Sequence, residues 1–419
     1  MHMRPADRTT ILLLLQSMAF LPLLVFFTKG TTVMLVFTLI AGSIYARSVP
    51  ALRSTYIGWV SLLFFAGVVS ALWSIAPTVS LERSAKLAMF LAALALLIHI
   101  VDRWTDEDRR RIAAMAILGW CIALAALCVI ALFGDAIAST LGGAFPSLKE
   151  KNRLYNIENL PNNGAVILVL TAFPVLRGIL QRQNGKLIAV GLTLVLFLMI
   201  FLSSSASALL GLCLGLVLWG ACVGFPKVFK RCFGPSLFAV LLLMPLLLTP
   251  LTNNIEPLVR NVPNFPNSFT HRILIWDFTI DRIAEKPLFG WGLETSRTIP
   301  GGDEKRKINY AVPWADKPLI IWDENLPLHP HNGALQVWLE LGLFGMLVVV
   351  ALLRKIVRTQ VVDRSVQAAG PMAGFLGAVI AVYCVAFGLM QSWWIAIMFL
   401  GWAALRAMEY GDLPAEADR

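Results

Sequence analysis

Charged residues are scarce in this sequence. Only 14% of its 419 residues are Asp, Glu, Lys or Arg, whereas 58% are hydrophobic. Soluble domains contain about 25% charged residues, so this composition excludes an ordinary soluble protein. The hydrophobic residues fall in runs of about 16 to 24, the length that a helix needs to cross roughly 30 Å of hydrocarbon. Because backbone amides in lipid must be satisfied within their own segment, we expect helices, and short alternating barrel strands are absent.

Other sequence signals are also missing. The six cysteines all lie in or beside apolar runs, so the outer loops carry no disulfide framework. There is neither a Walker-type glycine loop nor a cluster of metal ligands. Asp106-Glu107-Asp108 has the D-x-D spacing of nucleotide-sugar transferases, but it follows Thr105 and precedes three arginines. We interpret it as the acidic first turn of a capped helix.

The apolar runs predict an all-α, polytopic bundle of about twelve transmembrane helices. We place them at 10–28, 31–46, 55–73, 85–102, 112–134, 163–180, 187–202, 206–225, 234–251, 333–353, 371–390 and 391–408. No small-residue cleavage site follows the first run, so we expect it to be retained. The chain thus divides into helices 1–9 (1–251), a long loop (252–332), helices 10–12 (333–408) and a tail (409–419). The least certain boundary is at Ser203-Ser204-Ser205-Ala206-Ser207.

The net charge of +10 has an uneven distribution. Twenty basic residues lie at the N-terminus, in every second loop and at the C-terminus, whereas the intervening short loops hold six. The positive-inside rule therefore predicts that both termini are cytoplasmic and that residues 252–332 face the opposite side. We expect the membrane to be a bacterial inner membrane, which makes residues 252–332 periplasmic. This placement of charge argues against a nucleic-acid partner.

The long loop is densely charged, with nine basic and ten acidic residues, yet it is rich in Phe, Trp and Ile. Loops of this length in compact proteins are usually functional. Residues 269–283 predict an amphipathic helix with an apolar stripe at Ile273, Trp276, Ile280 and Ile283, which we expect to lie along the membrane interface. Pro287-Leu288-Phe289-Gly290-Trp291-Gly292 is a turn signal.

The loop ends at His329-Pro330-His331-Asn332-Gly333, immediately before an apolar helix. A neutral imidazole at this helix N-terminus is able to accept a proton near physiological pH. The alternative is that His329 and His331 only cap the helix or settle among lipid headgroups. The ionisable residues His271, Arg260, Arg297 and the Lys305-Arg306-Lys307 run are interpreted as a solvated face.

Four short motifs resemble those of the O-antigen ligase and O-antigen polymerase superfamily. His331-Asn332, nine residues, Gly342, two residues, Gly345 resembles the H-N-x9-G-x2-G signature, and Leu72-Trp73-Ser74-Ile75-Ala76-Pro77 is similar to the W-S-x-x-P element. Arg153-Leu154-Tyr155-Asn156 through Pro161-Asn162-Asn163 resembles the family's arginine loop, with Asn156 where glycine is usual. Arg272-x-x-x-Trp276 with the 287–292 turn resembles the periplasmic-loop element.

The resemblance implies a metal-independent, inverting glycosyltransferase without a cofactor that uses a polyprenyl-diphosphate-linked glycan. It implies His331 as the base, Arg272 and Arg153 as ligands of the diphosphate, and supporting roles for Asn332, His329 and Trp276. The arginines have alternative roles: Arg272 as a membrane anchor, and Arg153 in a headgroup-binding patch with Lys149 and Lys151.

Three functions remain open. O-antigen ligation to lipid A-core is the leading one; an O-antigen or exopolysaccharide polymerase, or a protein O-glycosyltransferase, shares the donor and differs only in the acceptor. The non-enzyme alternative is a secondary transporter, which would place ionisable residues at mid-membrane. Glu340 is the nearest example of such a residue in this sequence.

Overall fold

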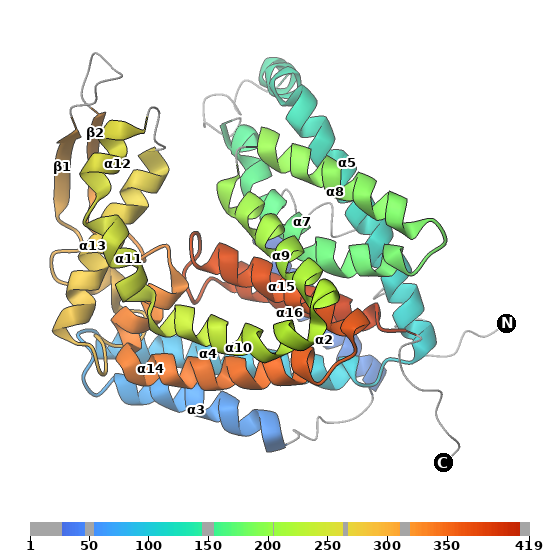
Figure 1. Ribbon diagram of the computed structural model, residues 1–419, viewed down its shortest axis with the longest axis horizontal. Coiled ribbons are helices and arrows are strands. Elements are labelled where there is room, and N and C mark those ends of the chain that lie inside the picture. The colour runs from blue at the N-terminus through green and yellow to red at the C-terminus, as the bar shows by residue number, and fades with distance from the viewer. Residues whose placement is uncertain are drawn as a thin grey trace.

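Helices make up most of the structure (Figure 1). This computed structural model describes residues 27–46, 54–144, 155–203, 205–262, 267–310 and 319–410. The longer described helices are α2 (Gly30–Ala46), α3 (Ser54–Ser70), α4 (Pro77–Val101), α5 (Asp106–Ala144), α7 (Tyr155–Leu180), α8 (Gly185–Leu202), α9 (Ala206–Gly224), α10 (Pro226–Leu242), α13 (Asn267–Glu285), α14 (Gly333–Val357), α15 (Val366–Tyr383) and α16 (Ser392–Ala407). The short ones are α11 (Met244–Thr252), α12 (Ile255–Asn261), the 3-10 helix η1 (Thr295–Thr298) and the π-helix η2 (Arg358–Val362). The all-α class is confirmed.

Seven described helices are long and apolar enough to cross a membrane, or eight if the bent pair α10 and α11 forms one span. They coincide with predicted spans 85–102, 112–134, 163–180, 187–202, 206–225, 234–251, 333–353 and 371–390. Shorter apolar helices match 31–46, 55–73 and 391–408. The run at 10–28 lies almost wholly outside the described residues, so the total of twelve stays a prediction.

The helix boundaries follow local sequence. Asp108 and Thr105 form a reciprocal cap, in which the Thr105 amide donates to the Asp108 carboxylate (3.0 Å) and the Asp108 amide donates to the Thr105 hydroxyl (3.2 Å). This arrangement confirms the capping interpretation of the D-x-D sequence. The serine-rich boundary is also confirmed, because α8 ends at Leu202 and α9 begins at Ala206. One predicted span was too long: the run 371–390 stops being helical after Tyr383.

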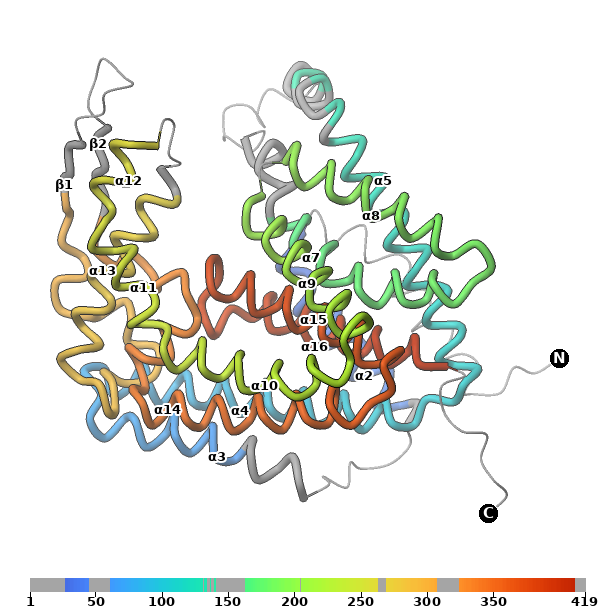
Figure 2. Tube along the Cα trace, viewed as in Figure 1, coloured from blue at the N-terminus to red at the C-terminus, as the bar shows by residue number. Residues whose placement is uncertain are grey.

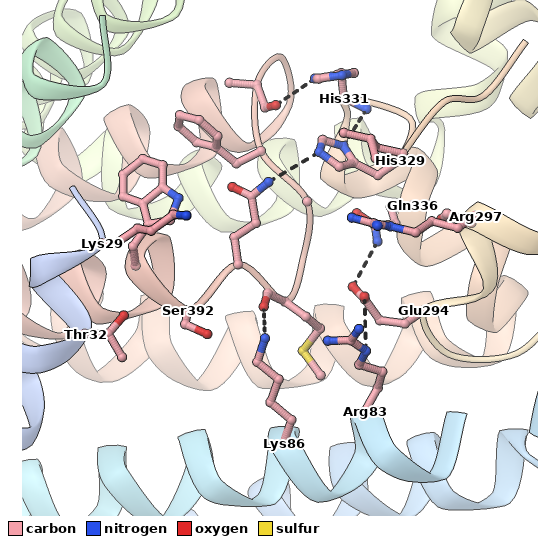
Figure 3. A pocket seen from close by; sticks show the side chains of 18 of the residues that line it. Lys29, Thr32, Arg83, Lys86, Glu294, Arg297, His329, His331, Gln336 and Ser392 are labelled. Atoms are coloured by element: carbon pink, nitrogen blue, oxygen red, sulfur yellow. Dashed lines mark hydrogen bonds and ion pairs between the residues drawn. The ribbon is translucent and has the colours of Figure 1, made fainter. Parts of the chain in front are cut away.

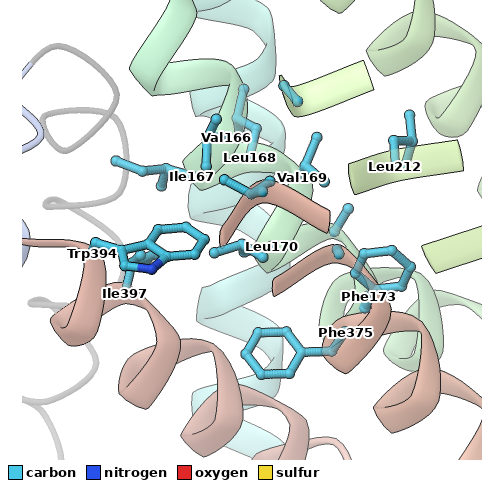
Figure 4. Close-up of a cluster of buried hydrophobic side chains, with 14 of the residues drawn as sticks. Val166, Ile167, Leu168, Val169, Leu170, Phe173, Leu212, Phe375, Trp394 and Ile397 are labelled. Carbon is cyan, nitrogen blue, oxygen red and sulfur yellow. The ribbon is translucent and has the colours of Figure 1, made fainter. Parts of the chain in front are cut away.

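The bundle interior is centred on α7. Its residues Val166 to Leu170 are all buried, so this helix is apolar on every side, as expected for a span enclosed by other helices. Figure 4 shows this run meeting Leu212 of α9, Phe375 of α15 and Trp394 of α16. The helix therefore forms the centre of the core of the described part of the bundle.

Small residues let α9 and α15 approach closely. A Cβ atom on Gly215 would lie 2.2 Å from the Phe173 ring and 2.7 Å from the Gly374 carbonyl oxygen. Membrane helices use glycine in this way because close backbone approach increases van der Waals packing where no hydrophobic effect operates.

The long loop forms a separate layer at one end of α4, α10 and α14 (Figure 2). It contains α12, α13 and a two-stranded hairpin, β1 (Lys305–Tyr310) with β2 (Leu319–Glu324). The strands are antiparallel, with Lys305 opposite Glu324 and Arg306 opposite Asp323. The sequence analysis predicted neither strand and took Lys305-Arg306-Lys307 for a solvated run.

The predicted amphipathic helix is present as α13, but its environment differs from the expected one. Ile273, Trp276 and Ile283 of its apolar stripe are 0%, 3% and 5% exposed because α11 and α14 pack against the helix. The expectation that this stripe lies on the membrane was therefore wrong. The stripe attaches the loop to the bundle.

Two glycines of α9 make a matched test of this packing. We expect Gly215→Ala to lower the free energy of unfolding by about 1–3 kcal/mol, because its methyl group overpacks the Phe173 and Gly374 contact. Gly220→Ala should leave stability unchanged or raise it slightly, since no atom lies within 4 Å of its added Cβ and alanine favours helices. Thermal unfolding midpoints in detergent provide the measurement; equal midpoints for the two variants would contradict the assignment.

Candidate active site

The tenth predicted span is broken at Gly342. This residue has a φ of +63° and ψ of −160°, so the regular bonding of α14 stops there. The segment Pro287–Gly292, which we name the clasp, supplies the missing hydrogen bonds with its own backbone. Its four bonds run from Trp291 N to Leu339 O (2.9 Å), Gly292 N to Glu340 O (2.8 Å), Leu343 N to Pro287 O (2.9 Å) and Phe344 N to Leu288 O (3.0 Å). The clasp thus accounts for two donors and two acceptors that the break exposes.

Glycine is required at two points of this contact. At Gly342 a Cβ would lie 2.5 Å from the backbone carbonyl of Leu288, and at Gly290, whose φ is +68°, it would lie 2.5 Å from the carbonyl carbon of Glu340. Both positions combine a left-handed backbone with close approach, which is glycine's particular use. The glycine of the resemblance motif at 342 therefore has a structural explanation.

The tryptophan-serine element supports the clasp from the other side. The Trp73 indole donates to the Phe289 carbonyl (3.0 Å), and the Ile75 amide donates to the Trp291 carbonyl (3.1 Å). Ser74 packs against Gly292 so closely that a Cβ there would lie 2.2 Å from its hydroxyl oxygen. This motif holds the clasp and does not line the cavity described below.

Glu340 is fully buried beside the break, and two loop residues together with Gln336 of α14 satisfy its carboxyl group. It accepts hydrogen bonds from the Glu294 amide (2.7 Å), the Ser296 hydroxyl (2.6 Å) and the Gln336 side chain (2.8 Å). A buried carboxylate with three donors fixes the loop to α14. Glu340, the mid-span acidic residue on which the transporter alternative was based, thus has a structural role.

His331 stands one residue before the N-cap of α14. The Asn332 side chain caps the helix by accepting from the Leu335 amide (3.0 Å). His331 has a φ of +51°, a left-handed conformation that is uncommon for residues with a Cβ and clusters at functional sites. Its Nδ1 lies 2.8 Å from the Ala386 carbonyl oxygen. A carbonyl only accepts, so Nδ1 carries the proton and Nε2 is left as the basic nitrogen.

The surroundings keep this imidazole neutral. Burial lowers the pKa of His331; the hydrogen bond to Ala386 partly opposes this, and the charge of Arg272 and the nearby His271 lower it further. His329 is buried more deeply, and desolvation lowers its pKa to about 3. Its Nδ1 accepts the backbone amide of His331 (3.1 Å), so His329 shapes the turn that presents His331.

Helix α13 brings the predicted arginine to this histidine. The Trp276 indole donates to the Pro330 carbonyl (2.9 Å) and thereby ties α13 to the segment between the two histidines. Arg272, one turn earlier, is half-buried, and desolvation lowers the pKa of its guanidinium. Arg272, His331, His329, Asn332 and Trp276 therefore converge as expected, whereas Arg153 lies outside the described residues.

A cavity of about 730 Å³ adjoins His329 and His331 (Figure 3). Arg83 and Lys86 from α4, with Arg297 from the long loop and Lys29, add positive charge to its lining. Lys86 also donates to the Met390 carbonyl (2.6 Å). The sequence analysis did not single out these cations, and it took Arg297 for part of a solvated face. The available signal was that Lys29, Arg83 and Lys86 were half of the basic residues assigned to the outer short loops.

One carboxylate faces these cations. Glu294, at φ +57°, places its carboxyl oxygens 3.8 Å from the Arg83 Nε and 3.4 Å from the Gln336 side-chain nitrogen. Burial raises the pKa of Glu294, while Arg83, Lys86 and Arg297 act to lower it. The cavity holds an excess of positive charge beside an imidazole whose neutral form is favoured, which is a suitable environment for a bound anion.

Comparison with known proteins bears on the same residues. Residues 191–350 match a family model described as O-antigen ligase. Proteins of Rickettsia conorii and Rickettsia typhi, each named "Putative polysaccharide ligase", are 28% identical to this chain over 243 and 240 residues. The resemblance to the O-antigen ligase superfamily is confirmed.

The ligase match contains the clasp, the broken α14 and His331, but not Arg83 or Lys86. Each rickettsial alignment covers 56% of this chain, and the chain spans about half the length of the relatives, at 54% and 55%. No solved structure matches the chain.

The clasp gives a test of the broken helix. We expect Gly342→Ala to destabilise the loop by about 1–3 kcal/mol, because its Cβ meets the Leu288 backbone in a left-handed conformation. Limited proteolysis should then cut within 287–292 faster than in wild type. Gly191→Ala, whose Cβ meets nothing within 4 Å, is the control. Wild-type cleavage rates in the Gly342 variant would show that the clasp does not depend on this glycine.

Proposed function

We propose that this protein is a membrane glycosyltransferase that moves a glycan from a polyprenyl-diphosphate carrier to an acceptor hydroxyl on the periplasmic side of a bacterial inner membrane. O-antigen ligation to lipid A-core is the assignment we favour. The observation that carries the proposal is His331, which lines a cation-rich cavity with its Nδ1 bound to a carbonyl and its pKa lowered mainly by burial. The ligase family match and the polysaccharide-ligase relatives support the glycan as substrate.

The residues account for both halves of a displacement at the anomeric carbon. The acceptor oxygen forms a bond to that carbon as its proton passes to the His331 Nε2. The bond between the carbon and the diphosphate oxygen breaks, and its electron pair leaves with the phosphate. A single displacement inverts the anomeric configuration. In this scheme neither a metal nor a cofactor takes part.

The departing diphosphate needs its growing negative charge neutralised. We assign this role to Arg83, Lys86 and Arg297, which line the cavity, to Arg272 beside His331, and to Arg153 as a further ligand. Arginine suits the task because its planar fork donates two parallel hydrogen bonds to phosphate oxygens. Of these cations, Arg272 also lowers the pKa of His331 and so favours its neutral form, which links donor binding to base function.

The spatial clustering of charge supports the proposed topology. Lys29, Arg83 and Lys86, assigned by sequence to the outer side, all reach the cavity. Arg177, Arg364 and Arg406, assigned to the inner side, instead gather around Glu409. This grouping agrees with a periplasmic site and cytoplasmic termini.

Transport is the weaker alternative because Glu340, the residue that would carry ions, is held by hydrogen bonds from Glu294, Ser296 and Gln336. A polymerase remains the second candidate within the enzyme class, since it shares this donor chemistry. Reconstitution with a lipid-diphosphate donor and two competing acceptors, lipid A-core and a second repeat unit, decides between ligase and polymerase. Exclusive elongation of the repeat unit would assign a polymerase.

His331→Ala tests the base. We expect glycan transfer to fall by about 10²–10⁴-fold, the usual contribution of general base catalysis, while the protein stays folded in the membrane. Transfer in proteoliposomes and the gel-filtration profile are measured together. His99→Ala, at the far end of α4, is the control variant and should transfer normally. Wild-type turnover without the His331 imidazole would reject this role.

The pH dependence tests how Arg272 acts on this base. The pKa of His331 lies below its usual 6.5, so transfer should persist at pH 6.5 and fall as the pH drops through the lowered value. Removing the Arg272 charge removes one cause of that lowering. Arg272→Gln should therefore move the acidic limb to higher pH, while Arg272→Lys keeps the charge and the limb.

Both Arg272 variants should turn over more slowly than wild type, because neither glutamine nor lysine reproduces bidentate phosphate contacts. The measurement is kcat as a function of pH, with saturating donor and acceptor. If the acidic limb of the kcat–pH profile is the same in wild type and Arg272→Gln, Arg272 does not affect the pKa of the base. If turnover is undiminished in both variants, Arg272 only anchors α13.

A further inference from the structure

One wall of the cavity, which we name the neutral wall, is lined by five uncharged residues, and Lys29 lies beside it on the same side (Figure 3). Thr32 of α2 and Gln391, Ser392 and Trp393 at the start of α16 line it, together with Phe387. Figure 3 shows Thr32 and Ser392 on the opposite side of the cavity from Arg83, Glu294 and Arg297. The cavity thus has a cationic wall and a neutral wall, and the imidazoles of His329 and His331 belong to the same enclosed space.

The neutral wall is held by contacts between distant parts of the chain. The Thr31 hydroxyl donates to the Trp393 carbonyl (2.9 Å), so α2 fixes the first turn of α16. The Phe387 and Trp393 rings meet nearly edge to face, with centroids 4.7 Å apart and an angle of 79°. The Gln391 amide lies 3.4 Å from the His329 Nε2. The aromatic surface therefore has a fixed position relative to the histidines.

Several polar groups on this wall have no hydrogen-bond partner among the described residues. The hydroxyls of Thr32 and Ser392 and the indole N–H of Trp393 form no hydrogen bond to another described residue. Hydroxyl groups both donate and accept, and an indole donates. Together with an aromatic face, they make a surface for a neutral ligand that is rich in hydroxyl groups.

We infer that this neutral wall is the binding site for the acceptor saccharide. A sugar presents hydroxyl groups around its rim and C–H bonds on its faces; the C–H hydrogens are weakly positive and pack on the negative face of an aromatic ring. Resting on the proposed function, the inference places the acceptor on α2 and α16 and the donor diphosphate on α4 and the long loop. The acceptor hydroxyl then approaches His331 from the side opposite the leaving group, as a single displacement requires.

Direct binding tests this inference independently of catalysis. The probes are a dephosphorylated core oligosaccharide for the neutral wall and inorganic diphosphate for the cationic wall, each titrated into the full-length protein in detergent. We expect Trp393→Leu to weaken oligosaccharide binding about ten-fold and to leave diphosphate affinity unchanged. Trp402→Leu is the control on the same helix, since the Trp402 indole bonds to Gln360 and does not line the cavity.

Thr32→Val provides a second variant, which removes one hydroxyl at nearly constant shape and does not depend on tolerance of the Trp393 change. It should also weaken oligosaccharide binding alone. Unchanged oligosaccharide affinity in both variants, or a loss of diphosphate affinity instead, overturns the inference.

Transfer assays on the same preparations keep the two hypotheses separate. Wild-type protein that binds the oligosaccharide through Trp393 but transfers no glycan would support the neutral wall and reject the proposed function. If the wild-type protein transfers glycan but the acceptor KM is unchanged in Trp393→Leu, the proposed function is supported and the neutral wall is rejected as the acceptor site. Wild-type protein that neither binds the oligosaccharide nor transfers glycan would reject both.

Discussion

The exchange of backbone hydrogen bonds at Gly342 is the constraint on which the rest of the site depends. An interrupted helix in an apolar environment leaves amides and carbonyls that water cannot satisfy, and each costs several kcal/mol if it stays unpaired. The clasp meets this demand with four bonds. Because the clasp also bonds to the Trp73 element, a single set of backbone contacts fixes α3, α14 and the long loop to one another.

These backbone contacts of the clasp also fix the positions of the functional groups. Glu294 is the second residue after the clasp and donates its backbone amide to Glu340, while Arg297 stands three residues further on. On the other side, α14 begins at the Asn332 cap, which sets where His331 leaves the helix. The connection between α15 and α16 completes the arrangement, because the Ala386 carbonyl orients His331 and the Met390 carbonyl accepts a hydrogen bond from Lys86. Separate stretches of sequence, from α2 to α16, thus define one cavity.

Much of this could be predicted from sequence, for physical reasons. A membrane-spanning run is a local property of composition, so helix positions could be inferred from hydrophobicity, and the α13 stripe from its periodicity. His331 could be identified because an ionisable residue immediately before an apolar helix is uncommon. Hairpin pairing, the protein cover over α13 and the end of α15 at Tyr383 depend on tertiary contacts, and no local pattern encoded them. The convergence of Arg83, Lys86 and Arg297 was missed for the same reason.

The broken helix also constrains the order of assembly. The clasp precedes residues 339–344 in the chain by about fifty positions, so its amides and carbonyls leave the ribosome before their partners exist. The loop cannot complete these bonds until the later span has been inserted beside α3 and α4. A nascent chain that stops before α14 carries both the cationic side of the cavity and the clasp, but it lacks the helix that organises them. Maturation of the site is therefore a late event in biogenesis, completed as the last helices enter the membrane.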